Sequence, residues 1–398
     1  MKTRLIGIAL FTLTLGAVLY YPSLNARHLI EQTGNTIEPV PVTRKPIVDV
    51  VFVLDTTGSM SGLIDAAKEK IWSIATTMSS AQPTPEIRIG LVGYRDRGDA
   101  YVTRIVNLSS DLDSVYAALM DFQADGGGDG PESVNKALYD AVHQMAWSQA
   151  DQAYQVIFLV GDAPPHMDYQ GEVQYPAILA SAAEKGIVVN TIQCGNMADT
   201  VPPWTQIASL GRGSYFQVEQ AGSAVAMSTP YDEEIATLSA KLDATRLYYG
   251  TAAEKEKMSA KVAATAKLHE GASMASRAGR GAFNSGEAGK DNFLGENELV
   301  DAVASGSVKL DELDKDALPE ALKPMAPEAQ VAYVAELAKE RKELNIRVRE
   351  LADARSDFMN KKVEEAGGAR DSLDQKLYDT VSRQAEVAGL VYEDGPAY

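Results

Sequence analysis

The sequence has few of the residues from which disulfide frameworks and soft-metal centres are built. Cys194 is the one cysteine among 398 residues, so an internal disulfide and a cysteine-based zinc cluster are both excluded. The four histidines are widely separated and form no histidine-rich motif. No glycine-rich phosphate-binding loop followed by lysine occurs either, which argues against a P-loop nucleotide enzyme.

Positive charge is also scarce. The chain carries 37 lysines and arginines against 55 acidic residues, for a formal net charge of -18. Proteins that bind nucleic acid present a basic face, so we expect no nucleic-acid partner. The hydrophobic fraction of 45% is enough for a normal core, and the length suggests two domains or one domain with a long extension.

The first 26 residues have the pattern of a targeting segment. Lys2 and Arg4 precede an uncharged apolar run over residues 5–21, which Pro22 ends. The run suits either a cleaved signal peptide or an N-terminal membrane anchor. Because no small-residue cleavage site follows, we favour the anchor. We therefore expect an extracytoplasmic protein of the periplasm or cell envelope, held in the inner membrane if the segment is not cleaved.

Composition divides the rest of the chain. Residues 27–46 contain three prolines and are expected to be a linker. Residues 47–222 alternate apolar runs with helix-like stretches, and residues 223–270 read as a helical extension. Glycine, serine and asparagine are frequent in residues 271–297, which predicts a flexible linker. Residues 298–398 are expected to form an α-helical hairpin with an imperfect coiled-coil seam, because leucines recur every seven residues while Arg341 and Arg355 occupy the partner positions. An ordinary solvated helix pair that packs on the main domain is an equal alternative.

An α/β fold is predicted for residues 47–222. Nearly continuous apolar runs are typical of parallel strands covered on both faces, and they occur at residues 48–54, 87–93, 154–160 and 187–192. Residues 101–106 alternate apolar with polar side chains and suit an edge strand, in an antiparallel pairing. Helical stretches separate the apolar runs, so the pattern predicts a doubly wound, mostly parallel sheet flanked by helices, Rossmann-like in its winding.

Oxygen-bearing side chains follow the predicted strands. Asp55, Thr57 and Ser59 come after the first strand, Asp162 comes after a central strand, and Glu132 stands where a loop enters a helix. Ligands of such sheets bind at the carboxyl ends of the strands. Hard divalent cations prefer oxygen ligands, so we expect Mg²⁺ there, with Ca²⁺ or Mn²⁺ as alternatives.

The segment Asp55-x-Thr57-x-Ser59, after a strand ending Phe52-Val53-Leu54, resembles the metal-ion-dependent adhesion site of the von Willebrand factor type A (vWA) family. The resemblance covers roughly residues 47–222 and is similar to an exported bacterial branch of that family. Many members supply a threonine from the third loop, whereas this sequence has Asp129-x-Pro131-Glu132, as in integrin β subunits. The resemblance implies the metal ligands Asp55, Thr57, Ser59, Glu132 and Asp162. Asp96 and Asp129 are candidates for acidic residues behind these ligands, and an exposed turn explains Asp96 equally well.

The resemblance implies a non-enzymatic adhesion or assembly module, in which an Asp or Glu of a protein partner completes the metal shell. Two alternatives stay open: a structural scaffold acting through its C-terminal helices, and a metal-dependent hydrolase, for which no basic constellation is evident. Three of these residues also have an ordinary explanation. Ser59 suits a helix cap, Glu132 suits the positive end of a helix, and Asp162 suits a turn.

Overall fold

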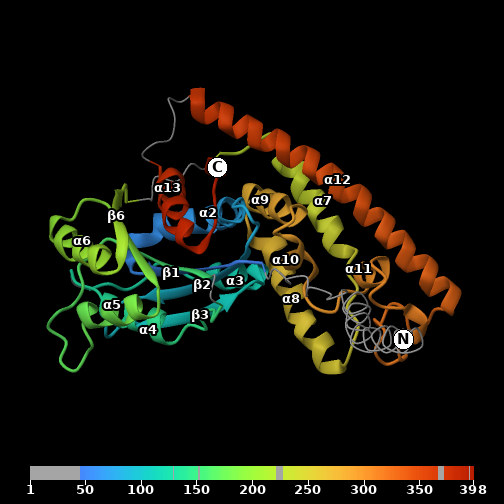
Figure 1. The fold of residues 1–398 in the computed structure, drawn as a ribbon, viewed down its shortest axis with the longest axis horizontal. Coiled ribbons are helices and arrows are strands. Elements are labelled where there is room, and N and C mark those ends of the chain that lie inside the picture. Colours follow the sequence, from blue (N-terminus) through green and yellow to red (C-terminus); the bar gives the residue numbers. More distant parts are fainter. Residues whose placement is uncertain (1–44, 129, 151–152, 221–226, 366–371, 394) are drawn as a thin grey trace, which may run out of the picture. The chain divides into compact units, whose positions relative to one another are not determined.

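The computed structural model describes residues 45–128, 130–150, 153–220, 227–365, 372–393 and 395–398 (Figure 1). The predicted targeting segment 1–26, most of the linker 27–46, and Asp129 lie outside these described residues. Within the described ranges, no helix is long and apolar enough to cross a membrane.

A six-stranded sheet forms the first half. Its strands are β1 (Ile47–Asp55), β2 (Glu86–Tyr94), β3 (Thr103–Ser109), β4 (Ala153–Gly161), β5 (Val188–Cys194) and β6 (Arg212–Val218), in the order β3-β2-β1-β4-β5-β6. Neighbouring strands are parallel except β2 and β3, which are antiparallel. The predicted fold class, a doubly wound, mostly parallel sheet followed by a helical region, is confirmed.

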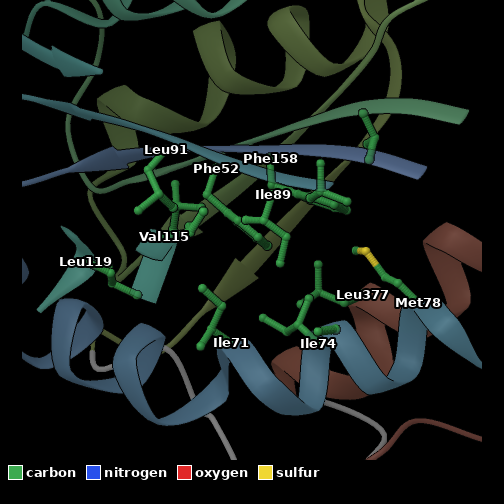
Figure 2. Packing of buried hydrophobic residues seen from close by; sticks show 14 of the residues in the cluster. Phe52, Ile71, Ile74, Met78, Ile89, Leu91, Val115, Leu119, Phe158 and Leu377 are labelled. Atoms are coloured by element: carbon green, nitrogen blue, oxygen red, sulfur yellow. The ribbon is translucent and has the colours of Figure 1, made fainter. Parts of the chain in front are cut away.

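Helices cover both faces of this sheet, which explains why the inner strands are mostly apolar on both sides. The helices α2 (Ser61–Ser79) and α3 (Leu112–Leu119) share one apolar cluster with the sheet. Figure 2 shows Phe52 and Phe158 of the strands facing Ile71 and Ile74 of α2. The opposite face is covered by α4 (Val134–His143), α5 (Tyr175–Glu184) and α6 (Val201–Leu210).

Where a flexible linker was predicted, over residues 271–297, the structure instead contains α9 (Met274–Ser285) and α10 (Lys290–Leu294). The glycines there serve close packing: a Cβ added to Gly281 would lie 2.9 Å from Cγ2 of Ile235. Arg280 and Phe283 of α9 are buried. Other helices after β6, which together with α9 and α10 form the helical half of the chain, are α7 (Asp232–Ala244), α8 (Ala252–Gly271), α11 (Leu299–Ala304) and α12 (Pro327–Glu365).

The predicted C-terminal hairpin does not form. The long helix α12 packs against α7, α9 and α11, whereas α13 (Leu373–Ala385) packs against α2 and β6 of the sheet half (Figure 1). Leu373, Leu377 and Val381 of α13 belong to the same apolar cluster as Phe52. The end of the chain therefore completes the core of the sheet half. Arg341, one of the two arginines in the predicted coiled-coil seam, is buried and forms an ion pair with Glu298, with Nη1 2.8 Å from Oε2.

Candidate functional site

The side chains predicted to bind metal come from three segments that meet at the carboxyl ends of β1 and β4. Leu54 is paired with Val160 in the parallel register of these strands, so Asp55 and Asp162 leave the sheet close to each other. The segment before α4 joins them, because the Glu132 amide donates to the Pro164 carbonyl oxygen at 2.9 Å.

The loop after β1 is organised by the carboxylate of Asp55. Its Oδ1 accepts hydrogen bonds from the Thr57 amide at 2.9 Å and from the Thr57 hydroxyl at 2.6 Å. The Thr57 hydroxyl lies 3.4 Å from the hydroxyl of Ser59. The other oxygen, Oδ2 of Asp55, is buried and has no hydrogen-bond partner among the described residues. The three residues thus form one polar unit with an unused carboxylate oxygen.

Glu132 lies in a similar environment. Its side chain is buried, and Oε2 has no hydrogen-bond partner in the part of the chain that the structure describes. The glycine-rich loop approaches it closely: Gly127 has φ +80°, and a Cβ there would lie 3.1 Å from Cβ of Thr57 and 3.5 Å from Oε1 of Glu132. Positive φ at Gly126 and Gly127 favours glycine at these two positions, because other residues are strained in that conformation.

Asp162 has a partner that the sequence did not reveal. Nε2 of Gln220, just after β6, donates to Oδ2 of Asp162 at 2.8 Å and lies 3.3 Å from the carbonyl oxygen of Ser59. Gln220 therefore ties the end of β6 to the loops after β1 and β4. The one available sequence signal is its position after the last strand.

Burial and mutual repulsion perturb the two orphaned carboxyl groups. Burial raises the pKa of Asp55 to about 7, and the charge of Asp162 adds to this, while hydrogen bonds from Thr57 oppose it. Burial raises the pKa of Glu132 to about 9, and the charges of Asp55, Asp96, Asp99 and Asp162 add to it. A cation at this position would favour the ionised form of both groups.

Asp96 supports the segment that carries Glu132. Its Oδ1 accepts from the hydroxyl of Ser133 at 2.9 Å, and its Oδ2 accepts from the hydroxyl of Tyr169 at 2.7 Å. Since Ser133 follows Glu132, these bonds fix the segment that carries Glu132. A stack of three side chains that the sequence did not predict borders Asp96: His166 lies on Tyr169 at 4.0 Å, and the Arg97 guanidinium lies 3.9 Å over the same ring.

The donor set fits a hard cation only if hydroxyl groups and water take part. Among the described residues, no three His, Cys, Asp or Glu side chains stand close enough to hold a metal ion by themselves. Mg²⁺ commonly takes one or two carboxylates and keeps several waters. The unpartnered oxygens of Asp55 and Glu132, with the hydroxyls of Thr57 and Ser59, match that requirement.

Comparison with known proteins bears on the first half of the chain. An ariadne-like RING finger protein of Acanthamoeba polyphaga mimivirus is 28% identical over 123 residues, which are 30% of this chain and 11% of that protein. The alpha-protein kinase vwkA of Dictyostelium discoideum is 28% identical over 136 residues, 32% of this chain and 21% of the kinase. The chain thus spans only a small part of the curated relatives that it matches.

Solved structures also match part of the chain. A von Willebrand factor type A structure from Catenulispora acidiphila is 18% identical, with a TM-score of 0.33, covering 44% of this chain and 39% of that one. The family model of the von Willebrand factor A domain matches residues 49–229. Together with the sheet described above, this match supports a von Willebrand factor A domain over residues 49–229.

Proposed function

We propose that this chain is an extracytoplasmic, non-enzymatic module that binds a protein partner through a divalent cation at the carboxyl edge of its sheet. Von Willebrand factor A domains are in general protein-interaction or adhesion modules, and the match over residues 49–229 supports that general role. Mg²⁺ is the first candidate, with Ca²⁺ and Mn²⁺ as alternatives.

One observation carries the proposal of a metal ion. Two carboxylate oxygens, Oδ2 of Asp55 and Oε2 of Glu132, are buried at the same sheet edge without a hydrogen-bond partner among the described residues. Leaving such groups unsatisfied costs roughly 1–3 kcal/mol each, more when they are charged. A bound cation removes this cost. The alternatives for single residues, a cap or a turn, leave both unpaired oxygens unexplained.

Each residue of the site has a separate task in this proposal. Asp55, Thr57, Ser59, Glu132 and Asp162 would hold the ion directly or through water. Gln220 and Asp96 hold Asp162 and the Glu132 segment in place through the hydrogen bonds described above. When bound, the cation supplies a positive charge that attracts a carboxylate of the partner protein.

Metal binding is tested by calorimetric titration of the full chain with MgCl₂. We expect one ion per chain, and an affinity at least about tenfold lower in Asp55→Ala, which loses a charged ligand. Asp65→Ala is the matched control, because Asp65 is an exposed aspartate on α2 whose carboxylate pairs with Lys68. Absence of uptake by the unaltered protein, or equal affinity in Asp55→Ala, would contradict a metal site here.

Partner binding and location need separate experiments. A pull-down from envelope extract is expected to lose its captured protein on addition of EDTA, and also with Asp55→Ala. Capture that survives both treatments would favour the scaffold alternative, in which the C-terminal helices bind the partner. Sequencing the N-terminus of the mature protein tests the anchor: a start near Arg27 would show cleavage instead.

A further inference from the structure

The loop after β4 carries two ring side chains, His166 and Tyr169, that are not among the proposed metal ligands. The two rings stack with their centres 4.0 Å apart and their planes 14° apart. The His166 amide donates to the carbonyl oxygen of Glu132 at 3.0 Å, and the Glu132 amide donates to the carbonyl oxygen of Pro164 at 2.9 Å. This loop is therefore paired, backbone to backbone, with the segment that carries a proposed ligand.

The hydroxyl of Tyr169 adds a second link, which runs through Asp96. It donates to Oδ2 of Asp96 at 2.7 Å, and the hydroxyl of Ser133 donates to Oδ1 of the same carboxylate at 2.9 Å. Asp96 is 7% exposed, so its carboxylate relies on donors within the protein. Since Ser133 follows Glu132 in the chain, the two hydrogen bonds connect Tyr169 to the neighbour of a proposed ligand.

Stacking fixes the ring that carries this hydroxyl. The guanidinium of Arg97 lies 3.9 Å from the centre of the Tyr169 ring, in addition to the stacked His166. Nη2 of Arg97 also lies 3.6 Å from Oε1 of Glu172, whose side chain is 9% exposed. Flat groups packed on an aromatic ring restrict its rotation, so the hydroxyl remains directed at Asp96.

His166 lies near the same carboxylate oxygen but is a poorer donor to it. Its Nε2 is 3.4 Å from Oδ2 of Asp96, and it forms no hydrogen bond with any described residue. Its Nδ1 lies 2.8 Å from Oδ1 of Asp168 instead. Among the described contacts, the Tyr169 hydroxyl is thus the short hydrogen bond to Oδ2 of Asp96, and its removal would leave that buried oxygen without one.

We propose that Tyr169 is a positioning residue for the candidate metal site. Its hydroxyl fixes Asp96, and Asp96 fixes Ser133 and with it the backbone that presents Glu132. Tyr169 would not contact the ion, and this role rests on the proposed metal ion. Hydrogen-bond partners directly behind metal ligands commonly change affinity by about 10- to 100-fold. Because two hydrogen bonds separate Tyr169 from the Glu132 segment, a smaller effect is expected.

Tyr169→Phe tests this role, because it keeps the stacked ring and removes only the hydroxyl. In a calorimetric titration of the full chain with MgCl₂, we expect an affinity about three- to tenfold lower than in the parent. Tyr154→Phe is the matched control, since it loses a hydroxyl bond of 2.7 Å to Oε1 of Gln384. Tyr154 lies at the start of β4, away from the strand end that carries the site, and its variant should match the parent within about twofold.

A second measurement needs no metal. Hydrogen exchange in EDTA, followed over residues 130–136, reports how firmly the Glu132 segment is held. Tyr169→Phe should exchange faster there, while β1 and β4 exchange as in the parent, and Tyr154→Phe should leave residues 130–136 unchanged. Faster exchange of Tyr169→Phe along the strands as well would indicate general destabilisation and would overturn the positioning role.

The outcomes separate this role from the metal site itself. If the parent takes up no Mg²⁺, the proposed function fails and this role fails with it. If the parent binds Mg²⁺ and Tyr169→Phe binds it equally well, or exchanges over residues 130–136 at the parent's rate, the metal site stands and the role of Tyr169 is wrong.

Discussion

Two buried acidic residues of this chain titrate in opposite directions because their neighbours differ. Burial alone would raise the pKa of Asp113, but the charges of Arg280 and Lys261 hold it well below the usual range. Burial raises the pKa of Glu132, and acidic neighbours raise it further. Asp113 is thus compensated by cationic side chains of the protein itself, whereas the neighbours that shift the pKa of Glu132 are acidic.

The raised pKa of Glu132 makes a prediction about stability without metal. Its folded-state pKa of about 9 exceeds the ordinary 4.5, so the group favours folding at low pH, and this contribution is lost as pH rises from about 4.5 to 9. In EDTA, Glu132→Gln should therefore be more stable than the parent by roughly 1–3 kcal/mol near pH 9, with little difference near pH 4. Urea unfolding at both pH values measures this.

The control for this experiment is Glu256→Gln, which changes an exposed glutamate of α8. It should leave the free energy of unfolding within about 0.5 kcal/mol at either pH. Equal stability of Glu132→Gln and the parent near pH 9 would mean that Glu132 is already satisfied within the protein.

At Arg280, loss of a neighbouring carboxylate is predicted to destabilise the protein, whereas loss of the Glu132 carboxylate is predicted to stabilise it. Its side chain is fully buried, with Nε 2.7 Å from Oδ1 of Asp113 and Nη1 2.7 Å from Oδ2 of Asp243. Asp113→Ala removes one of these partners and leaves buried positive charge, so it should cost about 3–5 kcal/mol in denaturant unfolding at neutral pH. The exposed pair of Lys257 and Glu296 is the comparison, and Lys257→Ala should cost at most about 1 kcal/mol. A similarly small loss for Asp113→Ala would contradict this.

At the scale of single residues, the sequence predicted the local part of the candidate site. The spacing of Asp55, Thr57 and Ser59 follows from one loop after one strand. The bond from Gln220 to Asp162 joins positions 58 residues apart and leaves no local pattern. The same holds for the pairing of Arg280 with Asp113, since an arginine in a glycine-rich stretch gives no indication of burial.

At the scale of elements, α13 stands out because it packs on the sheet half and not with α12, which precedes it in the sequence. Ser372 caps it, its hydroxyl accepting from the Gln375 amide at 3.2 Å. Leu373, Leu377 and Val381 follow at spacings of four and lie on one face of the helix. That face packs on the sheet half: in Figure 2, Leu377 lies beside Ile74 and Met78 of α2. The helix therefore acts as a part of the first half, although about 150 residues separate it from β6.

Truncating this face should destabilise the sheet half. Leu377 is 4% exposed, and Leu377→Ala should lower the free energy of unfolding by about 2–4 kcal/mol through lost burial and the cavity left behind. Val387, 95% exposed and close to α13, is the control, and Val387→Ala should change stability by less than about 0.5 kcal/mol. Equal effects of the two substitutions in urea unfolding would show that α13 does not belong to the core.

The sequence predicted strands more reliably than the later helices, for a physical reason. A parallel strand is buried on both faces, so its apolar run is visible without knowledge of its neighbours. Glycine and serine in residues 271–297 are equally typical of flexibility and of close helix contact, and only the partner helix decides between them. The apolar face of α13 likewise indicated that this helix packs against another element of the chain, but not against which one.

At the scale of the whole described chain, the two halves share one large apolar cluster, beside smaller clusters that belong to one half alone. Leu268 of α8 and Phe283 of α9 belong to the same apolar cluster as Phe52 of β1, and Leu373 belongs to it from the far end of the sequence. The buried pair of Arg280 and Asp113 crosses the same boundary. The composition change near residue 230 therefore marks a change of architecture without marking an independent folding unit.

Shared burial of this kind predicts cooperative unfolding. Differential scanning calorimetry of the full chain should show one transition, with equal calorimetric and van't Hoff enthalpies, because neither half can unfold without exposing apolar surface of the other. Asp113→Ala should lower the temperature of that transition without splitting it, since the contacts of Phe283 and Leu373 with the shared cluster remain. Two separate transitions in the parent protein would mean that the helical half folds alone, and would restore the division of the chain that composition suggested.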